Sequence, residues 1–114
     1  MVALAVPCVL SASGTILAVG SNPHTDSTDP SFVTGPSFVR VYRFNPEEDS
    51  WNIMGQEMQG AIDVQDGFGY DLALSADGLT MAVGTLSLYP GYCQVYRYDT
   101  SASIWREHGK LAGR

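Results

Sequence analysis

Short, mainly apolar runs, separated by turn-forming residues, recur along this chain and predict strands rather than helices. The clearest run is residues 38–44. Here Val39 and Val41 would face one side and Tyr42 and Phe44 the other, because successive side chains of a strand point to opposite faces. Both faces of this strand are apolar, so both need cover from another layer of structure.

The pattern occurs twice. Residues 10–20 match residues 74–84 at seven of eleven positions, and residues 41–45 match residues 95–99. Trp follows the Tyr of the second block by nine residues in both copies, and Gly follows that Trp by four. Agreement in order, identity and spacing indicates two tandem repeats. We assign residues 1–60 to the first, with a long loop at 21–37, and residues 61–114 to the second, with its N-terminal linker.

Each repeat is expected to fold as four strands. In both copies a turn, Ser13-Gly14 or Asp77-Gly78, separates two apolar runs, as in a β-hairpin. The expected first strands are residues 4–11 and 68–75, the second 15–20 and 79–84, and the third 38–44 and 92–98; the fourth begin near Trp51 and Ile104. Because one sheet cannot cover both of its own faces, radial stacking is the natural solution. The predicted fold is all-β: two four-stranded antiparallel blades of a β-propeller-like array.

Several of these motifs resemble the FG-GAP-like repeats of integrin-α-type β-propellers, especially the large repeat proteins of that type in microbial eukaryotes and bacteria. The resemblance covers nearly the whole chain and rests on Asp66-Gly67-Phe68-Gly69-Tyr70 and on residues 74–78, 82–84 and 95–98. It implies a blade fold and an extracellular or cell-surface setting, and it implies no particular activity.

The chain departs from that family at two places. Copy one has Leu4-Ala5 where the Phe-Gly pair is expected. The family's calcium loop needs several Asp or Asn residues between the first two strands, but here only Ser13 and Asp77 stand there. Because Ca²⁺ takes six to eight oxygen ligands, we predict no calcium site in either hairpin.

Residues that recur at equivalent repeat positions are expected to have structural roles. Trp51 and Trp105 should pack between sheets, and Arg43 and Arg97 should each pair with a carboxylate or stack on an aromatic ring. The signature residues that we assign to structure are Gly14, Gly20, Tyr42, Trp51, Phe68, Gly69, Gly78, Gly84, Tyr96 and Trp105.

Charge and composition exclude several partners. The formal net charge is −6, and the six basic residues are not clustered, which argues against nucleic acid. No apolar run reaches the length of a membrane span, so membrane insertion is not expected. Two cysteines, Cys8 and Cys93, make no disulfide framework and favour free, buried thiols.

No catalytic constellation is present. The two histidines, His24 and His108, lack motif-spaced partners, so we assign no catalytic, cofactor-binding or metal-ligating residues. Polar residues 24–29 of the long loop favour a solvated insertion over a ligand or metal loop, and Asp63 and Asp66 favour turn caps over a cation site.

We therefore expect a non-catalytic binding or scaffold module of a propeller that recognises protein or glycan. The alternative is a fragment of a propeller-based enzyme whose catalytic residues lie outside this chain. Because two sheets cover only the faces between them, the expected partners also include further blades of the same chain or self-association.

Overall fold

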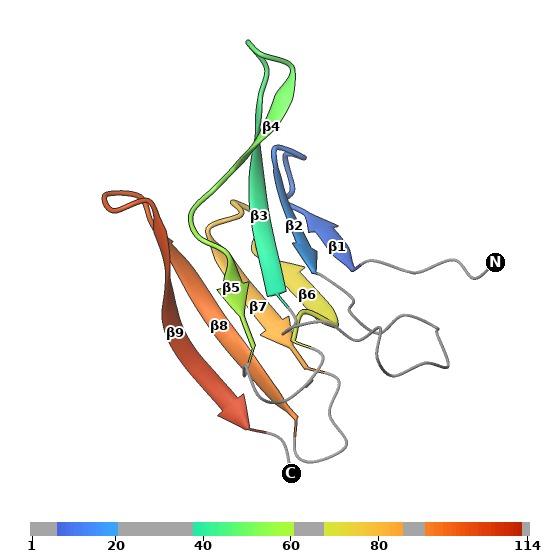
Figure 1. The fold of residues 1–114 in the computed structure, drawn as a ribbon, viewed down its shortest axis with the longest axis vertical. Coiled ribbons are helices and arrows are strands. Elements are labelled where there is room, and N and C mark those ends of the chain that lie inside the picture. The colour runs from blue at the N-terminus through green and yellow to red at the C-terminus, as the bar shows by residue number, and fades with distance from the viewer. Residues whose placement is uncertain (1–6, 21–37, 61–67, 86–90, 113–114) are drawn as a thin grey trace, which may run out of the picture.

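The computed structural model describes residues 7–20, 38–60, 68–85 and 91–112, and these residues form an all-β fold with no helix (Figure 1). The first sheet has the order β1-β2-β3-β4, with β5 also paired to β3, and the second has the order β6-β7-β8-β9; all pairings are antiparallel. The strands are β1 Cys8–Leu10, β2 Ile16–Gly20, β3 Phe38–Asn45, β4 Ser50–Ile53, β5 Met58–Gln59, β6 Asp71–Leu74, β7 Thr80–Gly84, β8 Tyr92–Asp99 and β9 Ile104–Ala112.

The all-β prediction is confirmed, and each expected strand corresponds to an observed one. The first strand of each copy is shorter than expected. In copy one, residues 4–6 lie outside the described residues and β1 begins at Cys8. In copy two, residues 68–70 form a turn before β6, because Gly69 has a positive φ of 91° that no regular strand adopts.

One strand was not predicted. After β4 the chain leaves the sheet at Met54 and Gly55, whose φ is 80°, and returns as β5 to pair with the start of β3. The first sheet therefore has five strands and not four. In copy two β9 pairs with β8 along its whole length. At the equivalent position the chain does not leave the sheet but forms a β-bulge opposite Val95 and Tyr96.

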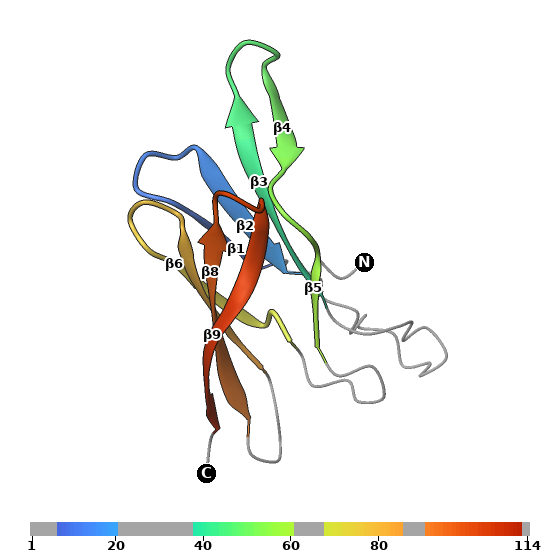
Figure 2. The same ribbon diagram turned by 90° about the vertical axis from the view of Figure 1, so that its left-hand side faces the viewer.

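The two sheets stack on each other and share one core, so the repeats are not two separate hydrophobic units (Figure 2). Sheet one contributes side chains that include Ile16, Ala18, Val39 and Val41, and sheet two contributes Met81, Val83, Gln94 and Tyr96. These sets are not repeat equivalents. The counterpart of Ala18 is Ala82 and that of Val41 is Val95, and both are only partly buried.

This difference shows how the sheets are oriented. Sheet one packs with the face that carries Ala18 and Val41. Sheet two packs with its Met81 and Tyr96 face, which in the repeat is equivalent to the other face of sheet one. The stacking is therefore head-to-tail. Each sheet has one face that no other described strand covers, which we call its free face, and this face carries the counterparts of residues buried in the other sheet. Backbone contact reinforces the arrangement at the hairpin turns, where the Ala12 N–H donates to the carbonyl oxygen of its counterpart Ala76 at 3.0 Å.

Candidate functional site

Trp105 on β9 anchors the junction between the sheets. It is 2% exposed, and its indole Nε1–H donates to the carbonyl oxygen of Met54 at 2.9 Å. Its ring centroid lies 5.1 Å from that of Tyr98. Gln56 fixes the backbone beside it, because its Nε2 donates to the Trp105 carbonyl at 2.6 Å while its Oε1 accepts from the Trp105 N–H at 2.8 Å. The predicted packing of Trp105 between sheets is confirmed.

The same prediction for Trp51 is wrong. Trp51 lies 5.2 Å from Phe44, centroid to centroid, at the same 57° interplanar angle as the Tyr98–Trp105 pair. The repeat thus reproduces the local ring pair, but Trp51 is 42% exposed. The cause is the head-to-tail stacking: the face of sheet two that carries Trp105 is buried, whereas the equivalent face of sheet one is free.

Two pairs of equivalent signature glycines, Gly14 with Gly78 and Gly20 with Gly84, also differ in how closely the other sheet approaches them. A Cβ atom on Gly78 would lie 2.6 Å from Cδ1 of Ile16, and one on Gly20 would collide with the carbonyl oxygen of Gly69. Their repeat counterparts are open: a Cβ on Gly14 would meet no atom within 4 Å, and the nearest atom to one on Gly84 is Cβ of Asp71 at 3.5 Å. Only one glycine of each pair is engaged by the neighbouring sheet.

Phe68 and Tyr96 extend the buried junction. Phe68 is 1% exposed and meets the Tyr96 ring edge-to-face at a centroid distance of 6.5 Å. Burial, with a smaller contribution from the charge of Glu107, raises the pKa of Tyr96 to about 12. Its counterpart Tyr42 lies half-buried on the free face of sheet one.

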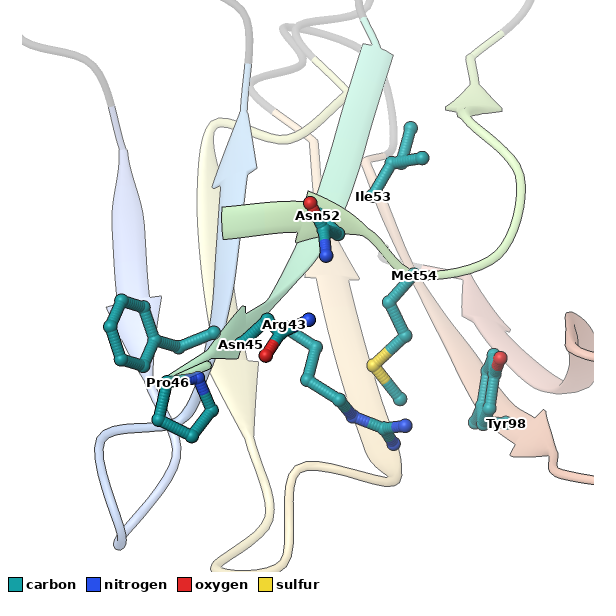
Figure 3. A pocket seen from close by; sticks show the side chains of 8 residues that line it. Arg43, Asn45, Pro46, Asn52, Ile53, Met54 and Tyr98 are labelled. Carbon is teal, nitrogen blue, oxygen red and sulfur yellow. The ribbon is translucent and has the colours of Figure 1, made fainter. Parts of the chain in front are cut away.

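A pocket of about 410 Å³ opens beside this junction, where the β3–β4 hairpin faces β8 (Figure 3). The side chains of Arg43 and Met54 extend into it, and Tyr98 forms the opposite wall. Asn52 lies directly across from Arg43 in the β3–β4 register. The lining residues are Arg43, Phe44, Asn45, Pro46, Asn52, Ile53, Met54 and Tyr98.

The charge of this pocket comes from Arg43. Among the described residues the ion pairs are Arg40–Glu57 at 2.7 Å and Arg106–Asp99 at 2.8 Å, so the carboxylate pairing predicted for Arg43 is not found there. The nearby carboxylate of Glu48 accepts hydrogen bonds from the side chains of Asn45 and Asn52 at 3.1 and 3.3 Å. Arg43 is an exposed residue, and it lies in a pocket where Glu48 holds the amide groups of Asn45 and Asn52 in place.

A second, shallower pocket of about 290 Å³ is the repeat counterpart of the first. It is lined by Arg97, Tyr98, Asp99, Arg106, Glu107 and His108. Arg97 takes the place of Arg43, Arg106 that of Asn52 and His108 that of Met54. The first pocket gains a far wall from Tyr98 of the next sheet, whereas every lining residue of the second comes from sheet two.

Asp77 has a structural role in the second hairpin turn. Its Oδ1 accepts from the Ser75 hydroxyl at 2.6 Å and from the Leu79 N–H at 3.0 Å. These hydrogen bonds, with a minor contribution from the charge of Arg97, hold the pKa of the Asp77 carboxyl below its usual value. In copy one Ser13 takes this position and hydrogen bonds to Thr15 at 2.7 Å.

We expect the turn to make stability acid-sensitive. A carboxyl whose pKa is lowered by folding stabilises the fold above its unfolded pKa, and that contribution is lost as the pH falls through the folded value. The melting temperature of Asp77→Ser should therefore fall less than that of the wild type below about pH 4. Ser13→Asp, which copies the second turn into the first, should make the acid dependence steeper. Thermal melts at a series of pH values measure both, and identical acid slopes in all three proteins would contradict the role of this carboxylate.

The remaining candidates give no site. Residues 24–29, Asp63 and Asp66 lie outside the described residues. Cys8 is exposed and Cys93 half-buried, and both are free thiols, so the expectation of two buried thiols is wrong for Cys8. In the described ranges no group of three or more His, Cys, Asp or Glu side chains could hold a metal ion.

The pocket and the stacked sheets could not have been identified from single motifs. The pocket needs Tyr98 opposite Arg43, a pairing across the two repeats, and the sequence marked both arginines only as repeated positions.

Within the described part of the chain, no helix is long and apolar enough to cross a membrane. No protein-family model, curated protein or solved structure matches this chain.

Proposed function

We propose that this chain is a non-catalytic binding module built from two blade-like repeats of a β-propeller-like array, and that its pocket binds a carboxylate-bearing segment of a protein or glycan. The observation that supports this function is the exposed Arg43 guanidinium in a pocket of about 410 Å³ formed jointly by both sheets. Pockets of this size on a rigid scaffold are typical ligand sites.

The chemistry of the lining favours a ligand that is partly anionic and partly flat. A guanidinium presents several N–H donors in a planar fork that fits a carboxylate. Tyr98 offers the face of an aromatic ring on the opposite wall, against which an apolar sugar face or a peptide side chain can pack. No lining residue is a nucleophile or a general base placed beside one, which supports binding rather than catalysis.

The test is a titration with trigalacturonate, with a glutamate-rich peptide and with neutral maltotriose. We expect the acidic ligands to shift the amide NMR signals of residues 43–46, 52–54 and 98, and maltotriose to bind more weakly. Because a hydrogen bond to a charged group contributes about 1.5–3 kcal/mol, Arg43→Gln should weaken binding of the acidic ligand at least about tenfold.

The repeat provides the matched control. Arg97→Gln removes an equivalent guanidinium from the pocket that lacks the second wall in the single chain, so at dilute concentrations where the chain is monomeric binding should stay within about twofold of wild type. Response to only one acidic ligand identifies the protein or the glycan as the source of the carboxylate. Equal loss in the two variants, or no shift with any ligand, would refute the pocket as the recognition site.

A further inference from the structure

The free face of sheet one is an apolar surface with a defined composition. Its exposed members include Trp51 at 42%, Ile53 at 55% and Leu10 at 52%. The antiparallel register places Leu10, Leu17, Tyr42 and Ile53 in one row across the sheet, and Phe44 and Trp51 in the next. We call these six residues the aromatic face. They exceed the isolated apolar residues that ordinary protein surfaces carry.

The equivalent face of sheet two is covered within the chain, by sheet one. The repeat counterparts of Leu17, Tyr42 and Trp51 are Met81, Tyr96 and Trp105, which are at most 6% exposed against sheet one. The surface that covers them is the face of sheet one around Ala18, Val41 and Gly55. The counterpart of this covering surface in sheet two is its own free face, around Ala82, Val95 and Gly109, which we call the receiving face.

The receiving face is at least partly exposed at the positions whose counterparts in sheet one pack against sheet two. A Cβ atom on Gly55 would lie 2.7 Å from the Trp105 ring, so Gly55 leaves the space that this indole occupies. At Gly109, the counterpart of Gly55, an added Cβ would meet no atom within 4 Å. Ala82 and Val95 are partly exposed, whereas their counterparts Ala18 and Val41 are 0% exposed.

We propose that a second copy of this chain docks head-to-tail, with the aromatic face of one copy on the receiving face of the next and the Trp51 indole over Gly109. The interface repeats the internal junction between the sheets. The indole Nε1–H of Trp51 then donates to the His108 carbonyl as that of Trp105 does to Met54. The same docking places Phe44 opposite Arg97, where it supplies the missing wall of the second pocket.

A head-to-tail interface closes into a ring or grows into a filament. Propellers close with four to eight sheets, so a ring of about two to four copies is the expected product. This inference rests on the repeat geometry and not on the ligand of the pocket, so failure of either leaves the other standing.

The experiment is analytical ultracentrifugation of the wild-type chain and two single variants at high micromolar concentration. Trp51→Glu places a charge on the aromatic face, and Val95→Glu places one on the receiving face. We expect the wild type to form one oligomer of two to four copies and each variant to be monomeric. Ala102→Glu is the matched control, because Ala102 lies in the β8–β9 turn and its repeat counterpart, Glu48, already carries this charge; it should assemble like the wild type.

Mixing the two variants distinguishes a head-to-tail interface from a symmetric one. Trp51→Glu retains the receiving face and Val95→Glu the aromatic face, so the mixture should form a one-to-one dimer that grows no further. Trp51→Glu also leaves Trp105 as the single tryptophan, and its blue-shifted fluorescence shows that the monomer is folded. A monomeric wild type would overturn the proposal, and so would a folded Val95→Glu that still self-associates. A wild type that binds only additional repeats, supplied as a separate chain, would also overturn it and would assign the aromatic face to further blades.

Discussion

Replacing Trp105 with alanine should destabilise the fold by about 3–5 kcal/mol, the usual cost of deleting a large buried aromatic side chain. Three interactions disappear together: burial of an indole that is 2% exposed, its contact with Tyr98, and the hydrogen bond from Nε1–H to the Met54 carbonyl. The carbonyl of Met54 would also lose a buried partner, which adds to the cost. Urea denaturation followed by circular dichroism measures the change.

Trp51→Ala provides a control with the same side-chain deletion and an equivalent ring neighbour, Phe44 in place of Tyr98. Because Trp51 is 42% exposed, its loss in a monomer should cost only about 1 kcal/mol, close to the value of an aromatic pair. The comparison must be made where the chain is monomeric, since docking of a second copy would bury Trp51. If both substitutions lowered the free energy of unfolding equally under that condition, the distinction between a filled and an open repeat position would be wrong.

The contrast between these tryptophans shows what the sequence could predict. The apolar runs and the Ser13-Gly14 and Asp77-Gly78 turns depend on local geometry, so they predicted the eight strands that the two copies share, although the first strand of each copy is shorter than predicted. Which face of each sheet is buried depends on how the copies stack, and identical motifs contain no information about that. Trp51 and Trp105 occupy the same position of the repeat and have opposite exposures.

A signal for the stacking direction does exist in the differences between the copies. On the face that sheet one buries, copy one has Ile16 and Val39, both at most 5% exposed. Copy two has Thr80 and Cys93 at the same positions, both partly exposed. At these two positions the more apolar residue lies on the covered face. On the other face the order is reversed, because copy one, whose face is free, has Phe44 and Ile53 where copy two has Tyr98 and Glu107, so comparing the copies would have predicted the orientation at some positions and not at others. The pocket still required the structure, because Arg43 and Tyr98 meet only across the junction.

β5 was missed for a different reason. Its two residues, Met58 and Gln59, are too few to show any periodicity, and their pairing with β3 depends on the turn at Gly55. That turn leaves the space that Trp105 fills. The extra strand and the buried tryptophan are thus two consequences of one backbone departure, and neither is visible in a single repeat.

The second large effect is expected where the backbone of Gly20 lies close to that of Gly69. Gly20 ends β2 and is buried, and a Cβ atom placed on it would collide with the carbonyl oxygen of Gly69. Backbone cannot move aside as a flexible side chain can, and a Cβ on Gly69 would itself press on Cγ2 of Val39 at 2.9 Å. Gly20→Ala should therefore separate the sheets locally and destabilise the fold by about 3 kcal/mol, at the upper end of overpacking costs.

Gly84→Ala is the repeat-matched control for this substitution. Gly84 ends β7 as Gly20 ends β2, but the nearest atom to its Cβ would be that of Asp71 at an ordinary 3.5 Å. Since neither glycine has a positive φ, alanine fits both backbones, and at position 84 it should leave the monomer unchanged or stabilise it by about 0.4–1 kcal/mol through the unfolded state. Urea denaturation of the two variants side by side decides the matter. A Gly20→Ala protein as stable as Gly84→Ala would mean that the sheets do not approach each other as closely as Gly20 and Gly69 indicate, and the head-to-tail junction would have to be redrawn.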